Sequence, residues 1–282
     1  MSRILRRLSL RRLRRALFVL AASVVTPAFA ADDPIEQFRP TGGEAFDHSA
    51  FGVLLERHVK PDSAGYNRVD YRALAAEHDA LDAYLDTLLA ASPATLSVDE
   101  AHAYWINLYN AKTLDVVLDH YPVESIRRIK LEGGGFLASL KPGPWSVPVV
   151  TVDGVELSLD DIEHRIIRPI FEDPMSHYGV NCASVSCPNL MATAYTGANV
   201  DALLAESGRQ YVNHPRGVEV RRGRIVASKI YSWYADDFGG EDALKAHWTA
   251  LAEPEKAAAI EAAEIGRYRY DWDLNDIGSA AM

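Results

Sequence analysis

Cysteine is scarce in this sequence. Only two occur among 282 residues, and both lie in the segment HYGVNCASVSCPNL, residues 177–190. This excludes the multi-disulfide framework of small exported domains. A bond between Cys182 and Cys187 would close only a short loop, so its entropic stabilisation would fall below the ~3 kcal/mol of a 15-residue loop. Stability alone is a weak reason for the pair, and a disulfide, a metal site and a catalytic thiol all stay open.

Long apolar runs are also lacking. After the first thirty residues no stretch is apolar over the ~20 residues that a bilayer-spanning helix requires. Near the start, the arginine-rich MSRILRRLSLRRLRR is followed by the short apolar run ALFVLAASVV and by TPAFA. This order is typical of a secretory signal peptide, here residues 1–30, cleaved after Ala30. We therefore expect a periplasmic or secreted protein with no stable membrane insertion after signal cleavage.

Positive charge is in deficit. The chain has 29 lysines and arginines against 39 aspartates and glutamates, a net charge of −10, and seven of the arginines lie in the expected signal peptide. Nucleic acids and anionic membranes are bound by surfaces rich in lysine and arginine. The composition thus argues against both as partners, and it leaves a small molecule or a peptide as the expected ligand.

Repeats, low-complexity linkers and changes of composition are absent after residue 45. We therefore expect a loose leader over 31–44 and a single domain over 45–278. The predicted helices cover 45–60, 71–92, 97–120, 159–171, 199–213 and 241–264. The predicted strands are the hairpins VPVVTVDGVELSL and GVEVRRGRIVAS and the segments HYGVNCA and RYRYDWDLN. Without strand–helix–strand alternation, the fold class is α+β: a helix-rich single domain with a small mixed sheet and two hairpins.

Two asparagines interrupt the apolar face of the helix predicted over 97–120. Asn107 and Asn110 fall inside a broad apolar arc, so we expect both to be buried. A buried amide without partners costs about 1–3 kcal/mol, so both must be hydrogen-bonded. They either form a structural network with a nearby loop or belong to a functional site, and we expect them to point toward Cys182.

A carboxylate sits on the apolar face of the helix predicted over 159–171, which Ser158 should cap and Pro169 should kink. Glu163 lies in the middle of this face, and His164 lies just past its edge. Neighbouring helical residues do not face each other, so Glu163 needs a partner from another element. We expect that partner to come from the asparagine helix or to be an arginine. Glu163 is then either a structural buried acid or a functional acid or base.

The cysteine segment is predicted to be a short buried strand. Its period of two would place Cys182 on the core-facing row and His177 on the opposite face. Cys187 precedes Pro188, a favourable first residue of a helix, so it could cap a helix and have a lowered thiol pKa. These local features favour Cys187 as the reactive sulfur.

Three kinds of chemistry fit these side chains. A thiol mechanism needs a cysteine, an imidazole and an orienting polar group, which Cys182, His164 or His177, and an asparagine or glutamate could supply. A zinc site could use both histidines and both cysteines, but their spacing matches no familiar zinc motif. A disulfide would prevent thiol chemistry while it persisted.

Four blocks resemble, in order, the domain of unknown function 547 family: AYWINLYNAKTLDVVLDHYP, SLDDIEHRIIR, HYGVNCASVSCPNL and YDWDLN. The likeness runs from about residue 45 to 275. The recurring features of the family correspond here to the following residues: Asn107, Asn110, Glu163, His164, His177 and Cys182. The resemblance implies that Cys182 is the functional sulfur, because the position of Cys187 varies within the family.

The resemblance leaves the activity open, because the family has no assigned function. A cysteine, a histidine and a carboxylate or amide on an α+β scaffold are similar to papain-like and transglutaminase-like enzymes. Here both histidines precede Cys182, so that likeness requires a permuted order. One hypothesis is a cysteine-dependent acyl transferase or hydrolase acting on an amide or thioester, without a metal or cofactor. The alternative is a non-enzymatic periplasmic binding module with a buried Asn/Glu/His/Cys polar network.

Overall fold

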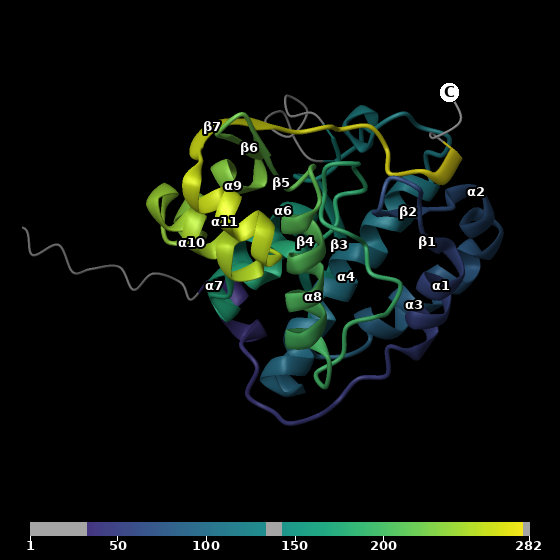
Figure 1. Ribbon diagram of the computed structural model, residues 1–282. Helices are drawn as coiled ribbons and strands as arrows, with labels where there is room; N and C mark the ends of the chain where they lie inside the picture. The colour runs from purple at the N-terminus through teal and green to yellow at the C-terminus, as the bar shows by residue number, and fades with distance from the viewer. Residues whose placement is uncertain (1–32, 134–142, 279–282) are drawn as a thin grey trace, which may run out of the picture. The chain divides into compact units, whose positions relative to one another are not determined.

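The computed structural model describes residues 33–133 and 143–278 (Figure 1). The chain divides into two units, Met1–Asp33 and Pro34–Met282, and of the first unit only Asp33 is described. The predicted signal peptide, residues 1–30, therefore lies outside the described residues. The elements below all belong to the second unit.

A single buried helix, α4 (Val98–Leu118), forms the centre of the larger core. Ser97 caps it by accepting a hydrogen bond from the Glu100 N–H, and nearly every side chain along it is buried. It packs against α3 (His78–Leu89) and, elsewhere on its surface, against α8 (Val200–Asn213) (Figure 1). Because it is enclosed, its polar side chains must find partners inside the protein.

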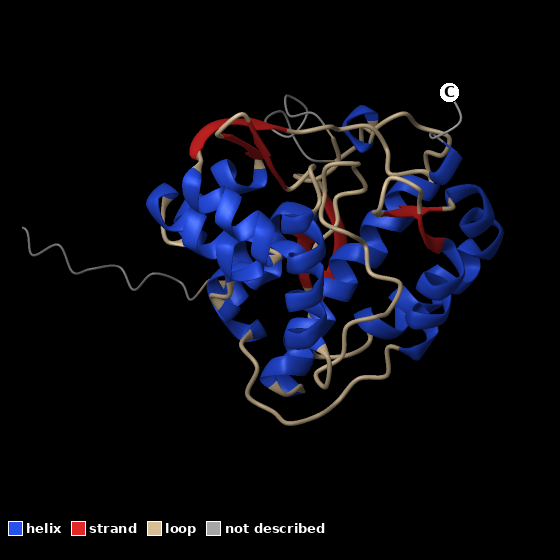
Figure 2. Cartoon of the chain, viewed as in Figure 1, coloured by secondary structure: helices blue, strands red, loops and turns tan. Residues whose placement is uncertain are grey.

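The strands are few and short, as Figure 2 shows. Two antiparallel pairs, β1–β2 (Val59–Pro61 and Asn67–Val69) and β3–β4 (Pro148–Val152 and Val155–Ser158), flank the helices. At the β3–β4 turn, Asp153 and Gly154 both have positive φ, at 46° and 82°, as a two-residue hairpin turn of type I′ requires. The predicted hairpin is confirmed.

A second core lies around the three-stranded sheet β5-β6-β7 (Val218–Arg221, Arg224–Ser228 and Glu264–Arg269). The sheet is mixed, because β6 pairs antiparallel with β5 and parallel with β7. The helices around this core are α9 (Ile230–Trp233), α10 (Glu241–Leu251) and α11 (Pro254–Ala262). Small sheets in a helix-rich domain confirm the α+β class.

The helix predicted over 159–171 forms, with a different internal geometry. Ser158 and Asp161 make a complete capping box at its start. After α6 (Leu159–Asp161), residues Ile162–Ile167 form a π-helical segment, and α7 (Arg168–Phe171) follows. The Arg168 N–H donates to the Glu163 carbonyl, five residues back. Pro169 has no N–H to continue the regular pattern, and wide turns of this kind are frequent at functional sites.

The structure corrects several other boundaries. Residues Pro34–Phe38 form a 3-10 helix with Ile35 and Phe38 buried in the core, so the expectation of a loose leader is wrong there. The helix predicted over 45–60 is shorter, α1 (Ser49–His58). The one predicted over 71–92 is broken into α2 (Tyr71–Leu74), a 3-10 turn and α3, and the one over 241–264 breaks before Pro254.

The largest error concerns the cysteine segment. Pro174–Tyr178 is a 3-10 helix, and residues 179–183 run irregularly instead of pairing as a strand. His177, Tyr178, Val180 and Asn181 are all buried, so no alternation of faces exists. No helix begins at Pro188 in the described chain, so Cys187 caps none. The closing strand predicted over 267–275 begins earlier, at Glu264, and ends at Arg269.

Among the described residues, no helix combines the length and the apolarity that crossing a membrane demands.

Asn110→Ala is expected to lower the free energy of unfolding by about 2–4 kcal/mol, because two buried backbone groups lose their partner. These groups are the Gly179 carbonyl, 2.9 Å from the Asn110 amide nitrogen, and the Asn181 N–H, 2.8 Å from its oxygen. Urea denaturation measures the change. Gln37→Ala, which removes an exposed amide, is the control and should change stability by less than about 0.5 kcal/mol. Equal effects of the two substitutions would contradict the structural role.

Candidate functional site

A cavity of about 250 Å³ collects most of the side chains that the sequence singled out. Cys182 and Cys187 line it, together with Glu163 and His164 from the π-helical segment and His177 from the 3-10 helix. Six aromatic residues also contribute to the lining: Tyr109, Trp145, Trp233, Tyr234, Tyr270 and Trp272. The described lining residues include neither lysine nor arginine.

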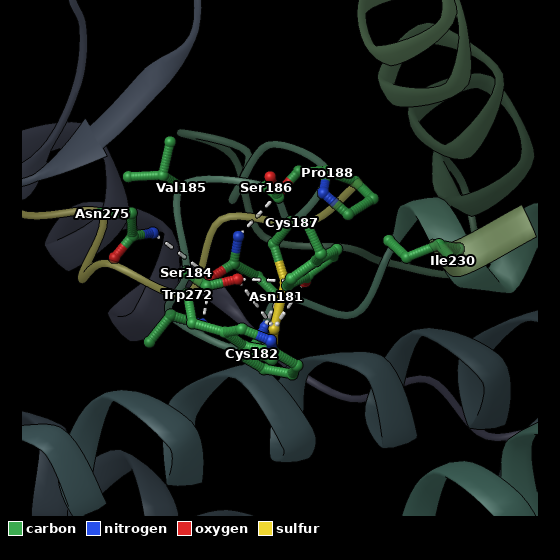
Figure 3. Close-up of a disulfide and its surroundings, with 12 residues drawn as sticks. Asn181, Cys182, Ser184, Val185, Ser186, Cys187, Pro188, Ile230, Trp272 and Asn275 are labelled. Atoms are coloured by element: carbon green, nitrogen blue, oxygen red, sulfur yellow. Dashed lines mark hydrogen bonds between the residues drawn. A yellow bond between two sulfur atoms is a disulfide. The ribbon is translucent and has the colours of Figure 1, made fainter. Parts of the chain in front are cut away.

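The two cysteines are joined in a disulfide (Figure 3). Their Cα atoms are 6.2 Å apart. The Tyr270 hydroxyl lies 3.1 Å from the Cys182 sulfur and 3.2 Å from the Cys187 sulfur. The Cys182 N–H donates to the Cys187 sulfur at 2.9 Å, and the Ser184 hydroxyl lies 3.3 Å from the Cys182 sulfur. Among described residues, hydroxyl and backbone groups contact the sulfur atoms, and no hydrogen bond from an imidazole reaches them.

Side chains hold the irregular cysteine loop in place. Asn181 donates to the Pro188 carbonyl at 2.7 Å and accepts from the Ala183 N–H at 2.9 Å, bridging the loop from within. The Ser186 hydroxyl accepts from the Asp271 N–H at 2.7 Å, which ties the loop to the C-terminal segment. The loop therefore has a fixed shape although it belongs to no helix or sheet.

His177 is fixed by an acid and an arginine. Its Nε2 lies 2.7 Å from Oδ2 of Asp237, and Arg168 forms two hydrogen bonds to the same carboxylate at 2.6 and 2.8 Å. Tyr234 stacks on the imidazole with ring centroids 4.2 Å apart. The Asp237 carboxylate accepts the hydrogen bond from Nε2–H, and the other ring nitrogen, Nδ1, lies 3.9 Å from Glu163. Hydrogen bonds from His177 and Arg168 hold the pKa of Asp237 well below its usual range.

Glu163 is buried, as expected, with 8 % of its surface exposed. Its neighbours from other elements are His177, whose Nδ1 lies 3.9 Å from the carboxylate, and Tyr234. Burial and this carboxylate together raise the pKa of Tyr234 far above its usual value. The expectation of partners outside its own helix is confirmed by His177 and Tyr234, and Tyr109 of the asparagine helix α4 also lies within the influence of the carboxylate. Among the described residues, no arginine forms an ion pair with Glu163.

His164 lies on the same wall and is more exposed than His177. Its Nδ1 is 4.0 Å from Glu163 and its Nε2 is 3.8 Å from Asp160. Both adjacent residues, Glu163 and His164, thus line the cavity, which the wide π-helical turn allows. Glu163 therefore lies within 4 Å of two imidazoles.

The two asparagines are buried, as predicted, and their partners differ. Asn110 binds the backbone at Gly179 and Asn181, just before Cys182. Asn107 binds both backbone groups of Tyr195, at 2.7 and 3.1 Å, and so holds a different loop. The prediction that both point toward the cysteine segment is confirmed for Asn110 and wrong for Asn107. Neither amide is among the described residues that line the cavity.

The zinc alternative finds no support in the geometry. Within the described chain, the side chains close enough to share a metal ion are His78, Asp82 and Asp115, far from the cysteines in sequence. Asp115 already pairs with His78 at 2.7 Å and with Lys112. Ion pairs inside the cluster satisfy these groups without a metal.

Sequence reasoning missed several residues of the site. Tyr234, Asp237 and Tyr270 reach it from segments that the helical and strand periods do not connect, whereas Arg168 lies on the helix predicted over 159–171 and acts through Asp237. A local signal exists in the aromatic density of IYSWYADDF and RYRYDWD, residues 230–238 and 267–273.

Residues 93–212 match the model of the family described as "Protein of unknown function, DUF547". This match supports the resemblance that the four sequence blocks indicated, and it covers the asparagine, Glu-His and cysteine blocks. Neither a curated protein nor a solved structure matches the chain.

Asp237→Asn is expected to destabilise the protein more at pH 7 than at pH 3.5. A carboxyl group with a lowered pKa in the folded state contributes stability above its unfolded pKa, near 4, and loses it as pH falls toward the folded value. Urea denaturation at both pH values should show the difference shrink by on the order of 1 kcal/mol, after allowance for solvent screening. Asp236→Asn, at the exposed neighbouring position, should show no such change. A pH-independent effect of Asp237→Asn would contradict the charge interaction.

Proposed function

We propose that this domain binds a small molecule or a short peptide in the aromatic cavity, through a ligand group that carries hydrogen-bond donors. The observation that carries the proposal is the pairing of a buried carboxylate, Glu163, with walls of aromatic rings and a disulfide floor. A disulfide-bonded Cys182 is no nucleophile, so binding is the function that this geometry supports best.

The walls of the cavity suit a ligand group that stacks on aromatic rings and donates hydrogen bonds. Trp233, Tyr270 and Trp272 pack against one another, with ring centroids 4.5 to 5.7 Å apart. Aromatic faces attract cations and apolar rings alike, and Glu163 accepts hydrogen bonds from an ammonium or hydroxyl group. Because the described lining has neither lysine nor arginine, an anionic group would find no permanently charged partner there. A cationic or neutral donor group therefore fits the cavity best.

Two cationic side chains lie next to the cavity. A neighbouring open hollow shares Trp145, Asp160, Trp233 and Trp272 with the cavity and adds Arg127 and Lys229. The Arg127 guanidinium lies over the Trp272 ring, 5.0 Å from its centroid. A ligand whose donor group enters the cavity can therefore place an anionic group at the rim. Amino acids and short peptides carry this arrangement of charges.

A cysteine-dependent acyl transferase or hydrolase is the second candidate. Cys182 is partly exposed in the same cavity as His164, His177 and Glu163, and this shared location favours it. This function requires prior reduction of the disulfide. It would also imply a relationship to papain-like or transglutaminase-like enzymes with a permuted order of the catalytic residues. The arginine-rich leader sequence supports export to the periplasm or beyond the cell for either candidate.

Free amino acids, dipeptides and diamines are expected to bind the oxidised protein more tightly than their N-acetylated forms. Acetylation removes the charge that Glu163 recognises, so we expect a preference of at least about tenfold in Kd, worth about 1.4 kcal/mol. Glu163→Gln should abolish the preference, and tryptophan fluorescence measures the binding. Glu56→Gln, an exposed acid elsewhere, is the control. Saturable binding whose Kd changes neither on acetylation of the ligand nor with Glu163→Gln would overturn the proposal.

In the reduced protein, Cys182 is expected to react rapidly with iodoacetamide near neutral pH if an imidazole supports its thiolate. Alkylation should slow about tenfold in whichever of the variants His177→Ala and His164→Ala lacks the imidazole that supports the thiolate. His120→Ala, at an exposed position outside the cavity lining, is the control. If neither cavity histidine affects the rate, the second candidate fails and the binding proposal is unaffected.

A further inference from the structure

We propose that the Cys182–Cys187 disulfide is a reactive bond, which exchanges with a thiol entering the cavity through attack on Sγ of Cys182 while Cys187 departs as a thiolate. This activity does not depend on the proposed ligand binding. It uses the disulfide as a reactant, whereas the binding proposal uses it as part of the floor.

The first support is access. Both cysteines line the cavity, so a small molecule can reach the bond. Cys182 is partly exposed, whereas Cys187 has 3 % of its surface exposed. Exchange requires a thiolate to approach one sulfur atom directly. The difference in exposure makes Cys182 the sulfur that is attacked.

The second support is the set of donors around the other sulfur. The Cys187 sulfur accepts the Cys182 N–H at 2.9 Å and lies 3.2 Å from the Tyr270 hydroxyl. The Ser184 hydroxyl donates to the Tyr270 oxygen at 3.0 Å, which leaves the tyrosine proton free to donate to sulfur. Burial raises the pKa of Tyr270, so this proton is retained. Donors that stabilise a thiolate make it a better leaving group.

The third support is the rigidity of the loop. Asn181 ties the chain before Cys182 to the Pro188 carbonyl, beyond Cys187, at 2.7 Å. Tyr211 donates to the Ser186 carbonyl at 2.6 Å, and the Ser186 N–H donates to the Asp271 carbonyl at 3.2 Å. These bonds do not depend on the disulfide. After the bond opens, the two sulfurs stay close, and this proximity favours return of the bond.

The reaction balances with thiols as the reductant. An incoming thiolate forms a bond to Sγ of Cys182, the disulfide breaks, and its electron pair moves to Sγ of Cys187. The Cys187 thiolate can attack Cys182 and expel the thiol again. Alternatively, a second thiolate attacks the sulfur of the bound thiol, which releases a small disulfide and leaves both cysteines reduced. Two thiols supply the two electrons, and solvent returns the protons.

The experiment uses the folded, oxidised full chain and cysteamine as the probe. The reaction is stopped with N-ethylmaleimide after short times, and peptide mass spectrometry locates the products. We expect the cysteamine adduct on Cys182 and maleimide on Cys187. An adduct on Cys187, or no adduct before urea unfolds the protein, would overturn the proposal.

Tyr270→Phe keeps the ring and removes the donor, and it should slow adduct formation about tenfold, the effect of losing one hydrogen bond to the departing sulfur. Tyr268→Phe, two residues earlier on β7, is the matched control, because its hydroxyl bonds Glu241 and not the sulfurs. In urea all three proteins should react at one rate. A Tyr270→Phe protein that reacts as fast as wild type in the folded state would remove the assigned role of the hydroxyl.

Discussion

The hydrogen bonds from Asn110 to the chain at Gly179 and Asn181 are the constraint on which the site depends. The cysteine segment is buried and irregular, so its backbone groups cannot be satisfied by a helix or a sheet. Asn110 offers one donor and one acceptor from the enclosed helix α4 and binds the segment as a neighbouring strand would. Asn107 does the same for Tyr195 one turn earlier. The two amides thus let a hydrophobic helix fix the backbone of two irregular loops, and one of these loops contains the disulfide.

A second constraint sets the wall opposite the disulfide. The π-helical turn before Pro169 brings both Glu163 and His164 to the cavity, where a regular helix would separate them by about 100° around its axis. Arg168, just after this turn, points away and holds Asp237, which in turn fixes His177. One wide turn therefore brings Glu163 and His164 to the cavity directly, and the Arg168 that follows it positions His177 through Asp237. The capping box at Ser158 fixes where that turn begins.

Sequence patterns predict the parts of this protein whose determinants are local. The buried helix α4, the Asp153-Gly154 hairpin and the cap at Ser158 depend on residues within one or two turns, and all three form as predicted. The cysteine segment was predicted wrongly because its apolar residues alternate by chance, while long-range bonds from Asn110 and the C-terminal segment decide its shape. Asp237 and Tyr270 were missed for the same reason. Asp237 contacts His177, 60 residues away in sequence, and Tyr270 contacts Cys182, 88 residues away, and hydrophobic periodicity carries no information on such long-range contacts. Burial of Glu163 was predictable from its helical face, but the identity of its partners was not.

The disulfide decides which chemistry the cavity can perform. While it is intact, Tyr270 contacts both sulfurs and the cavity offers a carboxylate, aromatic rings and a fixed imidazole, a set that can recognise a ligand. Once it is open, a thiol and two histidines line the same cavity, and these are the side-chain types that the proposed thiol chemistry requires. Neither state requires the scaffold to move, because Asn110, Asn181 and Ser186 hold the loop through backbone bonds that are independent of the sulfurs. The redox state of this one bond therefore decides which of the two proposed functions the site is equipped for, while its other groups stay in place.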